Sequence, residues 1–274
     1  MKKDNKIITL VVSMILVLGL GFWFGWSYLG SSRDTVSSAT RTPLPGFYGE
    51  RTPTPDSLAS STPQVSKTPA PISLPTKLPG KIIKAEVPFT SQAPFGDWSD
   101  PRYQDGCEEA SALMAVYWAR GISGITAQTA SDQIIGMSDW EQMSYGSFHD
   151  TSAQDTVDRI FKQYFNHKNV KVLNGVSAGD IINELEKENL VVIPADGQAL
   201  RNPFFTSPGP ERHMLVIIGY DYGTQEFITN DPGTRSGRDY RYDKNILFNA
   251  IRDYPSGYHE PIIGINKNII VVSK

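Results

Sequence analysis

The chain has 274 residues, a formal net charge of −3 and one cysteine, Cys107. A slightly acidic chain lacks the basic face that neutralises phosphates, so no nucleic-acid partner is expected. A lone thiol forms neither an intramolecular disulfide nor a cysteine-rich zinc site. The sequence contains no phosphate-binding loop and no His-Glu-x-x-His motif, so it indicates no cofactor and no metal.

The first 30 residues have the pattern of a membrane anchor. Three lysines within the first six residues precede Ile7–Leu29, which is almost continuously apolar. A helix needs about 20 such residues to cross a bilayer, whereas a cleaved signal peptide has an apolar core of about 7 to 15. Residues 1–30 are therefore predicted to be an uncleaved, single-pass anchor in the cell membrane, with the rest of the chain outside the cytoplasm. A long signal peptide cut near Ser31 is the alternative.

The next segment, residues 31–80, is rich in Pro, Ser and Thr and poor in large apolar side chains. Such a composition buries too little apolar surface to offset the entropy of ordering, so a disordered, extended linker is expected. From Lys81 the apolar spacing becomes that of a folded domain, which gives a predicted organisation of anchor, linker and a domain over residues 81–274.

Within this domain most helices precede most strands, an order typical of an α+β fold with an antiparallel sheet. Apolar residues at helical spacing or in alternation define the expected elements. In chain order these are a strand entering a loop over Ile82–Phe89; helices over Glu108–Arg120, Thr126–Ile135 and Thr156–Phe165; a strand over Asn169–Leu173; a helix over Ser177–Glu188; a strand over Leu190–Pro194; paired strands over Met214–Tyr220 and Glu226–Thr229; a helix over Asn245–Ile251; and a strand-rich run over Ile262–Val272.

Cys107 stands at the predicted start of a helix, directly after Gly106. The amides at a helix N-terminus carry partial positive charge, which lowers a thiol pKa and helps to hold an oxyanion. Cys107 is therefore a candidate nucleophile, and a buried structural thiol is the alternative. Glu108 and Glu109 follow it, and their charges oppose a thiolate unless the carboxylates point away.

His213 opens an apolar strand, where the sheet fixes a side chain as a general base requires. Asp231 follows the next strand, and adjacent antiparallel strands are expected to bring it beside His213 as the orienting acid. Asn230 is a competing orienter, and Asp231 with the following Pro and Gly also has the composition of an ordinary turn. Of the other histidines, His149 and His167 are expected at the surface and His259 in a loop.

Taken together, these sequence segments resemble those of the C39-like cysteine peptidases, which are papain-fold relatives of the bacteriocin-processing peptidases. The resemblance rests on four short segments in this order: Val87–Gln92, Gly106-Cys107, Arg212–Asp221 and Asn230–Pro232. It implies a papain-like α+β fold in which helices pack on an antiparallel sheet.

The resemblance also implies site roles. Cys107 would be the nucleophile, His213 the base and Asp231 the orienter, with a Gln amide completing the oxyanion hole. That Gln is Gln92, or alternatively Gln104. The family commonly has Gly after the nucleophile, where this chain has Glu108.

The expected activity is that of a thiol-dependent peptidase or amidohydrolase acting on extracytoplasmic peptide or peptidoglycan-like material, with water or an amine as acceptor. A non-catalytic surface module that binds such material is the main alternative. A third hypothesis is a structural anchor in which the linker over residues 31–80 is the functional part. The sequence does not indicate an oligomeric state.

Overall fold

The computed structural model describes residues 80–274. The predicted anchor over residues 1–30 lies outside the described residues, as does all but the last residue of the predicted linker. Within the described part, no helix combines the length and the apolar character that a membrane crossing needs.

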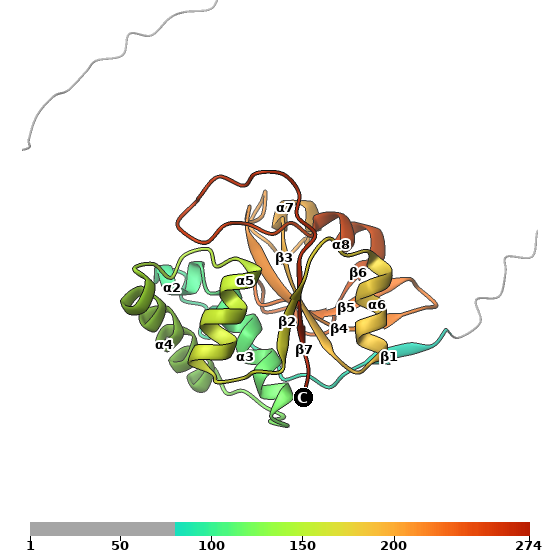
Figure 1. Cartoon of the computed structure of the whole chain (residues 1–274), viewed down its shortest axis with the longest axis horizontal. Helices are drawn as coiled ribbons and strands as arrows, with labels where there is room; N and C mark the ends of the chain where they lie inside the picture. The colour runs from blue at the N-terminus through green and yellow to red at the C-terminus, as the bar shows by residue number, and fades with distance from the viewer. Residues whose placement is uncertain (1–79) are drawn as a thin grey trace, which may run out of the picture. The chain divides into compact units, whose positions relative to one another are not determined.

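The centre of the domain is one antiparallel sheet of seven strands (Figure 1). Its strands lie in the order β2-β7-β3-β4-β5-β6, and β1 pairs with one end of β4. The strands are β1 (Ile82–Lys84), β2 (Val170–Leu173), β3 (Leu190–Ala195), β4 (His213–Asp221), β5 (Glu226–Asn230), β6 (Tyr240–Asp243) and β7 (Ile269–Val272).

Helices cover both faces of this sheet (Figure 1). One layer contains α3, α4 and the π-helix η1, and the opposite layer contains α6 and α8. The helices are α2 (Pro101–Gln104), α3 (Cys107–Ala119), α4 (Ala127–Tyr145), α5 (Ala153–Asp155), η1 (Thr156–Tyr164), α6 (Ala178–Glu186), α7 (Gly197–Leu200) and α8 (Lys244–Ala250). The predicted α+β fold with an antiparallel sheet is confirmed.

Alternation along the strands divides the core into two clusters. In β4, Met214 and Val216 face the α3 layer, whereas Leu215 and Ile217 face the α6 and α8 layer. This is the period-two pattern of a strand whose two faces are both buried. The central strands are therefore held from both sides, which fixes the position of residues at their ends.

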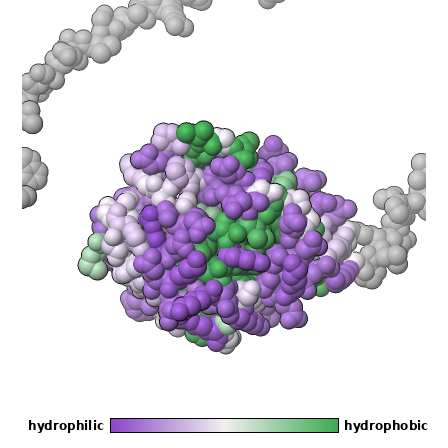
Figure 2. All heavy atoms as spheres, in the orientation of Figure 1, coloured by the Kyte–Doolittle hydropathy of each residue, from purple (hydrophilic) through white to green (hydrophobic). Residues whose placement is uncertain are grey.

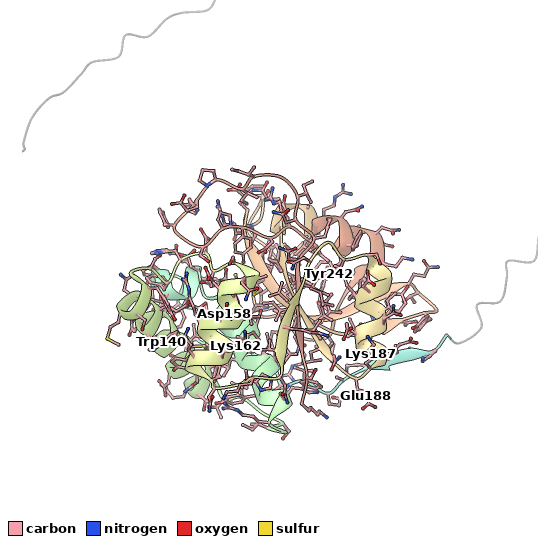
Figure 3. The ribbon with its side chains drawn as sticks, in the orientation of Figure 1. Trp140, Asp158, Lys162, Lys187, Glu188 and Tyr242 are labelled. Carbon is pink, nitrogen blue, oxygen red and sulfur yellow. The ribbon has the colours of Figure 1, made fainter. Side chains whose placement is uncertain are left out.

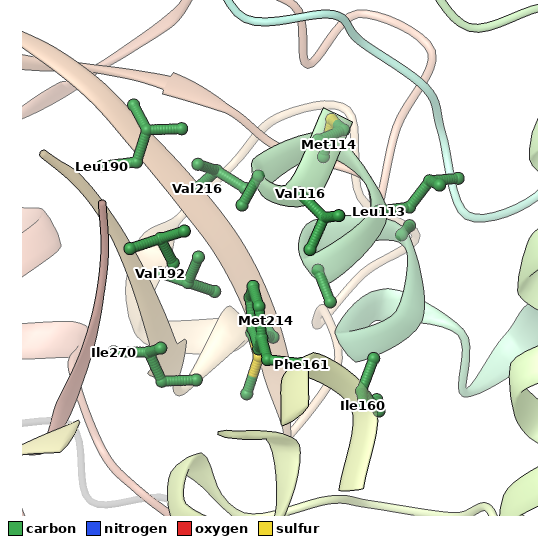
Figure 4. Close-up of a cluster of buried hydrophobic side chains, with 14 of the residues drawn as sticks. Leu113, Met114, Val116, Ile160, Phe161, Leu190, Val192, Met214, Val216 and Ile270 are labelled. Atoms are coloured by element: carbon green, nitrogen blue, oxygen red, sulfur yellow. The ribbon is translucent and has the colours of Figure 1, made fainter. Parts of the chain in front are cut away.

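Helix α3 is the most deeply buried helix of its layer. Leu113, Met114 and Val116 are fully buried and pack toward strand side chains such as Val192 and Val216 (Figure 4). A buried Leu truncated to Ala typically costs 2–5 kcal/mol, depending on how far the cavity collapses. This packing anchors the helix whose first residue is Cys107.

Several predicted elements differ in extent. Helix α4 continues ten residues beyond the expected Ile135 to Tyr145, and the next residue, Gly146, caps it with a positive φ of 81°. Over Ile82–Phe89 the strand ends at Lys84 and the rest is a loop, as expected, but of the strand-rich run Ile262–Val272 only Ile269–Val272 is a strand. The four short elements α2, α5, α7 and β6 were not predicted.

The long connection between α8 and β7 runs across the top of Figure 1. Its Ile263 and Ile265 are 85% and 70% exposed, which explains why the prediction of a strand failed: these residues pair with no strand. Polar side chains cover most of the face drawn in Figure 2, with apolar areas at its centre and upper edge. On η1, Asp158 and Lys162 form an exposed ion pair of 2.8 Å one turn apart (Figure 3).

Candidate active site

Four of the five predicted site residues line one cavity of about 480 Å³. Cys107 and His213 contribute to its wall, and so do both candidate glutamines, Gln92 and Gln104. The lining comes from three segments that are distant in sequence: residues 92–107, 204–213 and 233–235. Asp231 lies behind the His213 ring and is completely buried.

The pairing of β4 with β5 brings His213 and Asp231 together. Val216 of β4 pairs with Asn230 of β5, so the start of β4 and the residue after β5 meet at one end of the sheet. Nε2 of His213 lies 2.8 Å from Oδ1 of Asp231. A carboxylate only accepts hydrogen bonds, so Nε2 carries the proton and Nδ1 is the ring nitrogen left to act as a base.

Asp231 is held as an anion. Burial opposes ionisation, yet the charge and hydrogen bond of His213 and the other donors hold the pKa of Asp231 below its ordinary value. Its Oδ2 accepts from the Tyr242 hydroxyl at 2.6 Å and from the Asn202 amide at 3.3 Å, and its Oδ1 also accepts from the Gly233 amide at 2.9 Å. Every oxygen of this buried carboxylate therefore has a donor.

Asn230, the competing orienter, faces elsewhere. Its amide donates to the backbone carbonyl oxygens of Val87 and Pro88 at 3.3 and 3.4 Å. It thus holds the segment after β1 against the sheet and does not contact the His213 ring.

The His213 ring has close neighbours on two sides. The Phe205 ring meets it edge to face, with centroids 5.3 Å apart. A Cβ built on Gly233 would lie 2.9 Å from Cε1 of His213, closer than real Cβ contacts allow. Gly233, two residues after Asp231, is therefore needed for the ring to fit, beyond any role in a turn.

The thiol is oriented differently from the sequence expectation. Sγ of Cys107 donates to Oε2 of Glu108 at 3.0 Å. Burial raises the pKa of the Cys107 thiol well above its ordinary value, and the charge of Glu108 adds to that. The prediction that the helix N-terminus lowers this pKa is therefore wrong for the arrangement observed. Glu108 does not point away.

Helix α3 is docked next to the histidine. Ser111, one turn after Cys107, donates from its hydroxyl to the backbone carbonyl of Met214 at 3.1 Å. Met214 directly follows His213, and its backbone is also close enough to the sulfur to oppose the rise in thiol pKa. These contacts bring the thiol and the imidazole to the same cavity.

The two glutamines differ in what their amides can still donate. Gln92 is buried and donates from Nε2 to the carbonyls of Tyr103 and Gln104, both at 2.9 Å, so both of its amide hydrogens are used. Its Oε1 is buried and has no partner among the described residues. Gln104 donates one hydrogen to the carbonyl of Trp98 at 2.7 Å and keeps the other.

Residues 84–256, more than half of the chain, match the family model described as "Peptidase_C39 like family". The chain belongs to the C39-like peptidase family. Its membership and its α+β fold suggest a cysteine peptidase. A crystal structure of a C39-like peptidase from Bacillus anthracis aligns at 18% identity with a TM-score of 0.47, and the match covers 71% of this chain and 98% of that one. A search of curated proteins found no match.

Next to Cys107 in the sequence begins a cluster of three buried carboxyl groups, Glu108, Glu109 and Glu141, called here the carboxyl cluster. Glu108 also accepts from the Tyr254 hydroxyl at 2.7 Å and from the Thr151 amide at 3.2 Å.

Burial, the largest cause, raises the pKa of Glu108 to about 7 and that of Glu141 to about 8. Burial and the charge of Glu141 also raise the pKa of Glu109 well above its ordinary value. Oε2 of Glu109 and Oε2 of Glu141 are both buried and have no hydrogen-bond partner among the described residues. The cluster thus holds protons at neutral pH. The sequence shows Glu108 and Glu109 beside Cys107, but it gives no sign that they are buried together with Glu141.

The remaining histidines lie outside the cavity. His149 is half-buried, 3.6 Å from Asp105 and stacked on Phe148, so it is less exposed than a fully solvated surface residue. His167 is also half-buried, and His259 lies in a loop as expected. Within residues 80–274 no three His, Cys, Asp or Glu side chains are grouped as a metal site requires.

Tyr242, Asn202 and Phe205 support the His213–Asp231 pair but were not predicted as site residues. Tyr242 lies on β6, a strand that sequence reasoning missed (Figure 3). Its only signal is the alternation of Tyr240 and Tyr242 around a charged residue, which is typical of a strand.

Proposed function

We propose that the chain is a membrane-anchored, extracytoplasmic cysteine peptidase that acts on peptides or peptide-containing wall polymers. Cys107 is the nucleophile, His213 the general base and Asp231 its orienter. The observation that carries the proposal is the 2.8 Å contact between His213, which lines the same cavity as Cys107, and a fully buried, fully hydrogen-bonded Asp231 behind it. A buried anion that fixes one imidazole nitrogen leaves the other to take a proton.

The reaction begins when the thiol turns from Glu108 toward His213. The thiol proton passes to Nδ1, the sulfur attacks the substrate carbonyl, and the imidazolium then protonates the leaving amine. The backbone N–H of Cys107 and a glutamine amide stabilise the oxyanion. Gln104 has a free hydrogen for this, whereas Gln92 must first release a carbonyl. Water then attacks the acyl-enzyme, with His213 again as base.

The test is turnover of a diverse peptide library by the full-length protein, followed by mass spectrometry. Cys107→Ala and His213→Ala are expected to abolish cleavage, because each removes a group that takes part in bond-making. The matched control is His149→Ala, since His149 lies outside the cavity. Cleavage that survives Cys107→Ala would refute the proposal.

A non-catalytic surface module is the second candidate, and two observations favour it. The thiol is bonded to Glu108 with a raised pKa, and both amide hydrogens of Gln92 are used. That function predicts peptide binding that Cys107→Ala leaves intact, with no turnover by the parent protein. Calorimetric titration with the same peptides separates the two candidates.

The proposal also covers the location of the chain at the membrane and the molecule that accepts the acyl group. Residues 1–30 anchor the chain, residues 31–80 form the linker, and residues 81–274 form the peptidase domain outside the cytoplasm. Protease protection of the domain in inside-out vesicles, but not in whole cells stripped of their wall, tests this topology. Adding an amine such as hydroxylamine to the cleavage reaction tests whether the acyl group goes to water or to an amine.

A further inference from the structure

The charged side chains that line the cavity are all cationic. Arg212 and Arg235 contribute to its wall, and its lining includes no Asp or Glu. The chain as a whole carries a formal charge of −3, so the charge of the cavity lining has the opposite sign to the net charge of the chain. A cleft lined by one sign of charge raises the local concentration of ligands of the other sign.

The two arginines differ in how far their charge is compensated. The Arg212 side chain is only 6% exposed and lies 3.6 Å from Asp150 and 3.3 Å from Glu211. Arg235 is exposed, and within residues 80–274 no carboxylate oxygen lies within 4.0 Å of its guanidinium. The uncompensated charge in the cavity is therefore that of Arg235.

A neighbouring glycine leaves room for the Arg235 guanidinium. Gly96 has a φ of +74°, and a Cβ built on it would lie 1.6 Å from a terminal nitrogen of Arg235. The guanidinium therefore occupies the space that any other residue at position 96 would fill. Trp98, 43% exposed, lines the same cavity and offers apolar surface there.

We propose that Arg235 binds a carboxylate of the substrate, so that the cleft selects acidic peptides. This inference rests on the proposed peptidase function and names its substrate class. A guanidinium matches a carboxylate with two parallel hydrogen bonds, which gives both affinity and orientation. The carboxylate is either an acidic side chain near the scissile bond or a free C-terminus.

The experiment compares peptide pairs that differ by one charge, on the full-length chain. One arm replaces Glu by Gln at each position around the cleaved bond, and the other replaces the terminal carboxylate by an amide. At least one pair is expected to show a kcat/KM ratio of about 10 or more in favour of the acid. Arg235→Gln should reduce that ratio to within about twofold of unity, mainly by loss of activity on the acidic peptide.

Arg238→Gln is the matched control, because Arg238 lies three residues further along the same loop but stacks over Phe89 and does not line the cavity. It should leave the ratio unchanged. A ratio that Arg235→Gln does not alter, or a preference for the neutral peptides, would overturn the inference.

A second measurement separates failure of this inference from failure of the peptidase function. Alkylation of Cys107 by anionic iodoacetate and by neutral iodoacetamide needs no turnover. Arg235→Gln is expected to lower the iodoacetate-to-iodoacetamide rate ratio by about threefold or more at low salt, with no change in Arg238→Gln. If no peptide is cleaved but this ratio falls, the peptidase function fails and the anion-selective cleft stands. An unchanged ratio counts against the cleft.

Discussion

Replacing Glu108 by Gln should make the Cys107 thiol more acidic and more reactive. The carboxylate oxygen lies 3.0 Å from the sulfur in a buried setting. With an effective dielectric constant of about 20, a full negative charge at that distance disfavours the thiolate by about 5 kcal/mol, or about 4 pKa units. Because the pKa of Glu108 is raised to about 7, that charge is only partly present near neutral pH. A drop in the thiol pKa of about one to two units is therefore expected.

The assay is the pH dependence of iodoacetamide alkylation of the single cysteine, followed by intact-mass spectrometry. At about pH 7 the Glu108→Gln variant should react about 10 to 100 times faster than the parent, since each pKa unit changes the thiolate fraction about tenfold. Gln retains an oxygen to accept from Tyr254 and Thr151, so the fold should persist.

Glu109→Gln is the matched control. Glu109 also raises the thiol pKa, but more weakly, and it makes no hydrogen bond to the sulfur. Its effect on the rate should be clearly smaller. An unchanged or slower rate in Glu108→Gln, with normal circular dichroism, would refute the idea that Glu108 restrains the thiol.

Three further predictions concern the support of the site and the stability of the fold. Tyr242→Phe removes a hydrogen bond to buried Asp231 and should cost about 1.5–3 kcal/mol in urea unfolding together with a loss of kcat, whereas unchanged stability would contradict the contact. The raised pKa values of Glu108 and Glu141 mean that the folded state prefers their protonated forms. The stabilisation that comes from protonating these two carboxyl groups is fully present below about pH 4.5 and is lost as pH rises through 7 to 8. The unfolding free energy should therefore fall by a few kcal/mol between about pH 5 and 8.5. The fall should be less steep in the Glu141→Gln variant. The exposed pair of Asp158 and Lys162 should matter little, and Asp158→Asn should change the unfolding free energy by less than about 1 kcal/mol.

The fold could be predicted where apolar periodicity is strong. Helix α3 and the paired strands β4 and β5 have long, regular apolar patterns, and their expected positions agree with the structure within one or two residues. Short elements such as β6 lack that signal. The run Ile262–Val272 failed because apolar composition alone does not distinguish a strand from an exposed loop, and Gly264, with a φ of +77°, lies in that loop.

The site could be predicted where it depends on strand ends. Placing His213 before β4 and Asp231 after β5 required only the antiparallel pairing of neighbours, and the two side chains do meet. The direction of the thiol could not be predicted, because it depends on where the Glu108 side chain turns once α3 is packed. Tyr254, which shares Glu108 with the thiol, is distant in sequence and gives no local signal.

The order of the site residues along the chain has a consequence for biosynthesis. His213 and Asp231 belong to one hairpin, whereas Cys107 lies on the order of a hundred residues earlier. A growing chain therefore displays its thiol well before the imidazole has been made. The cavity that holds both groups can therefore form only after β4 and β5 have been made and have packed against α3.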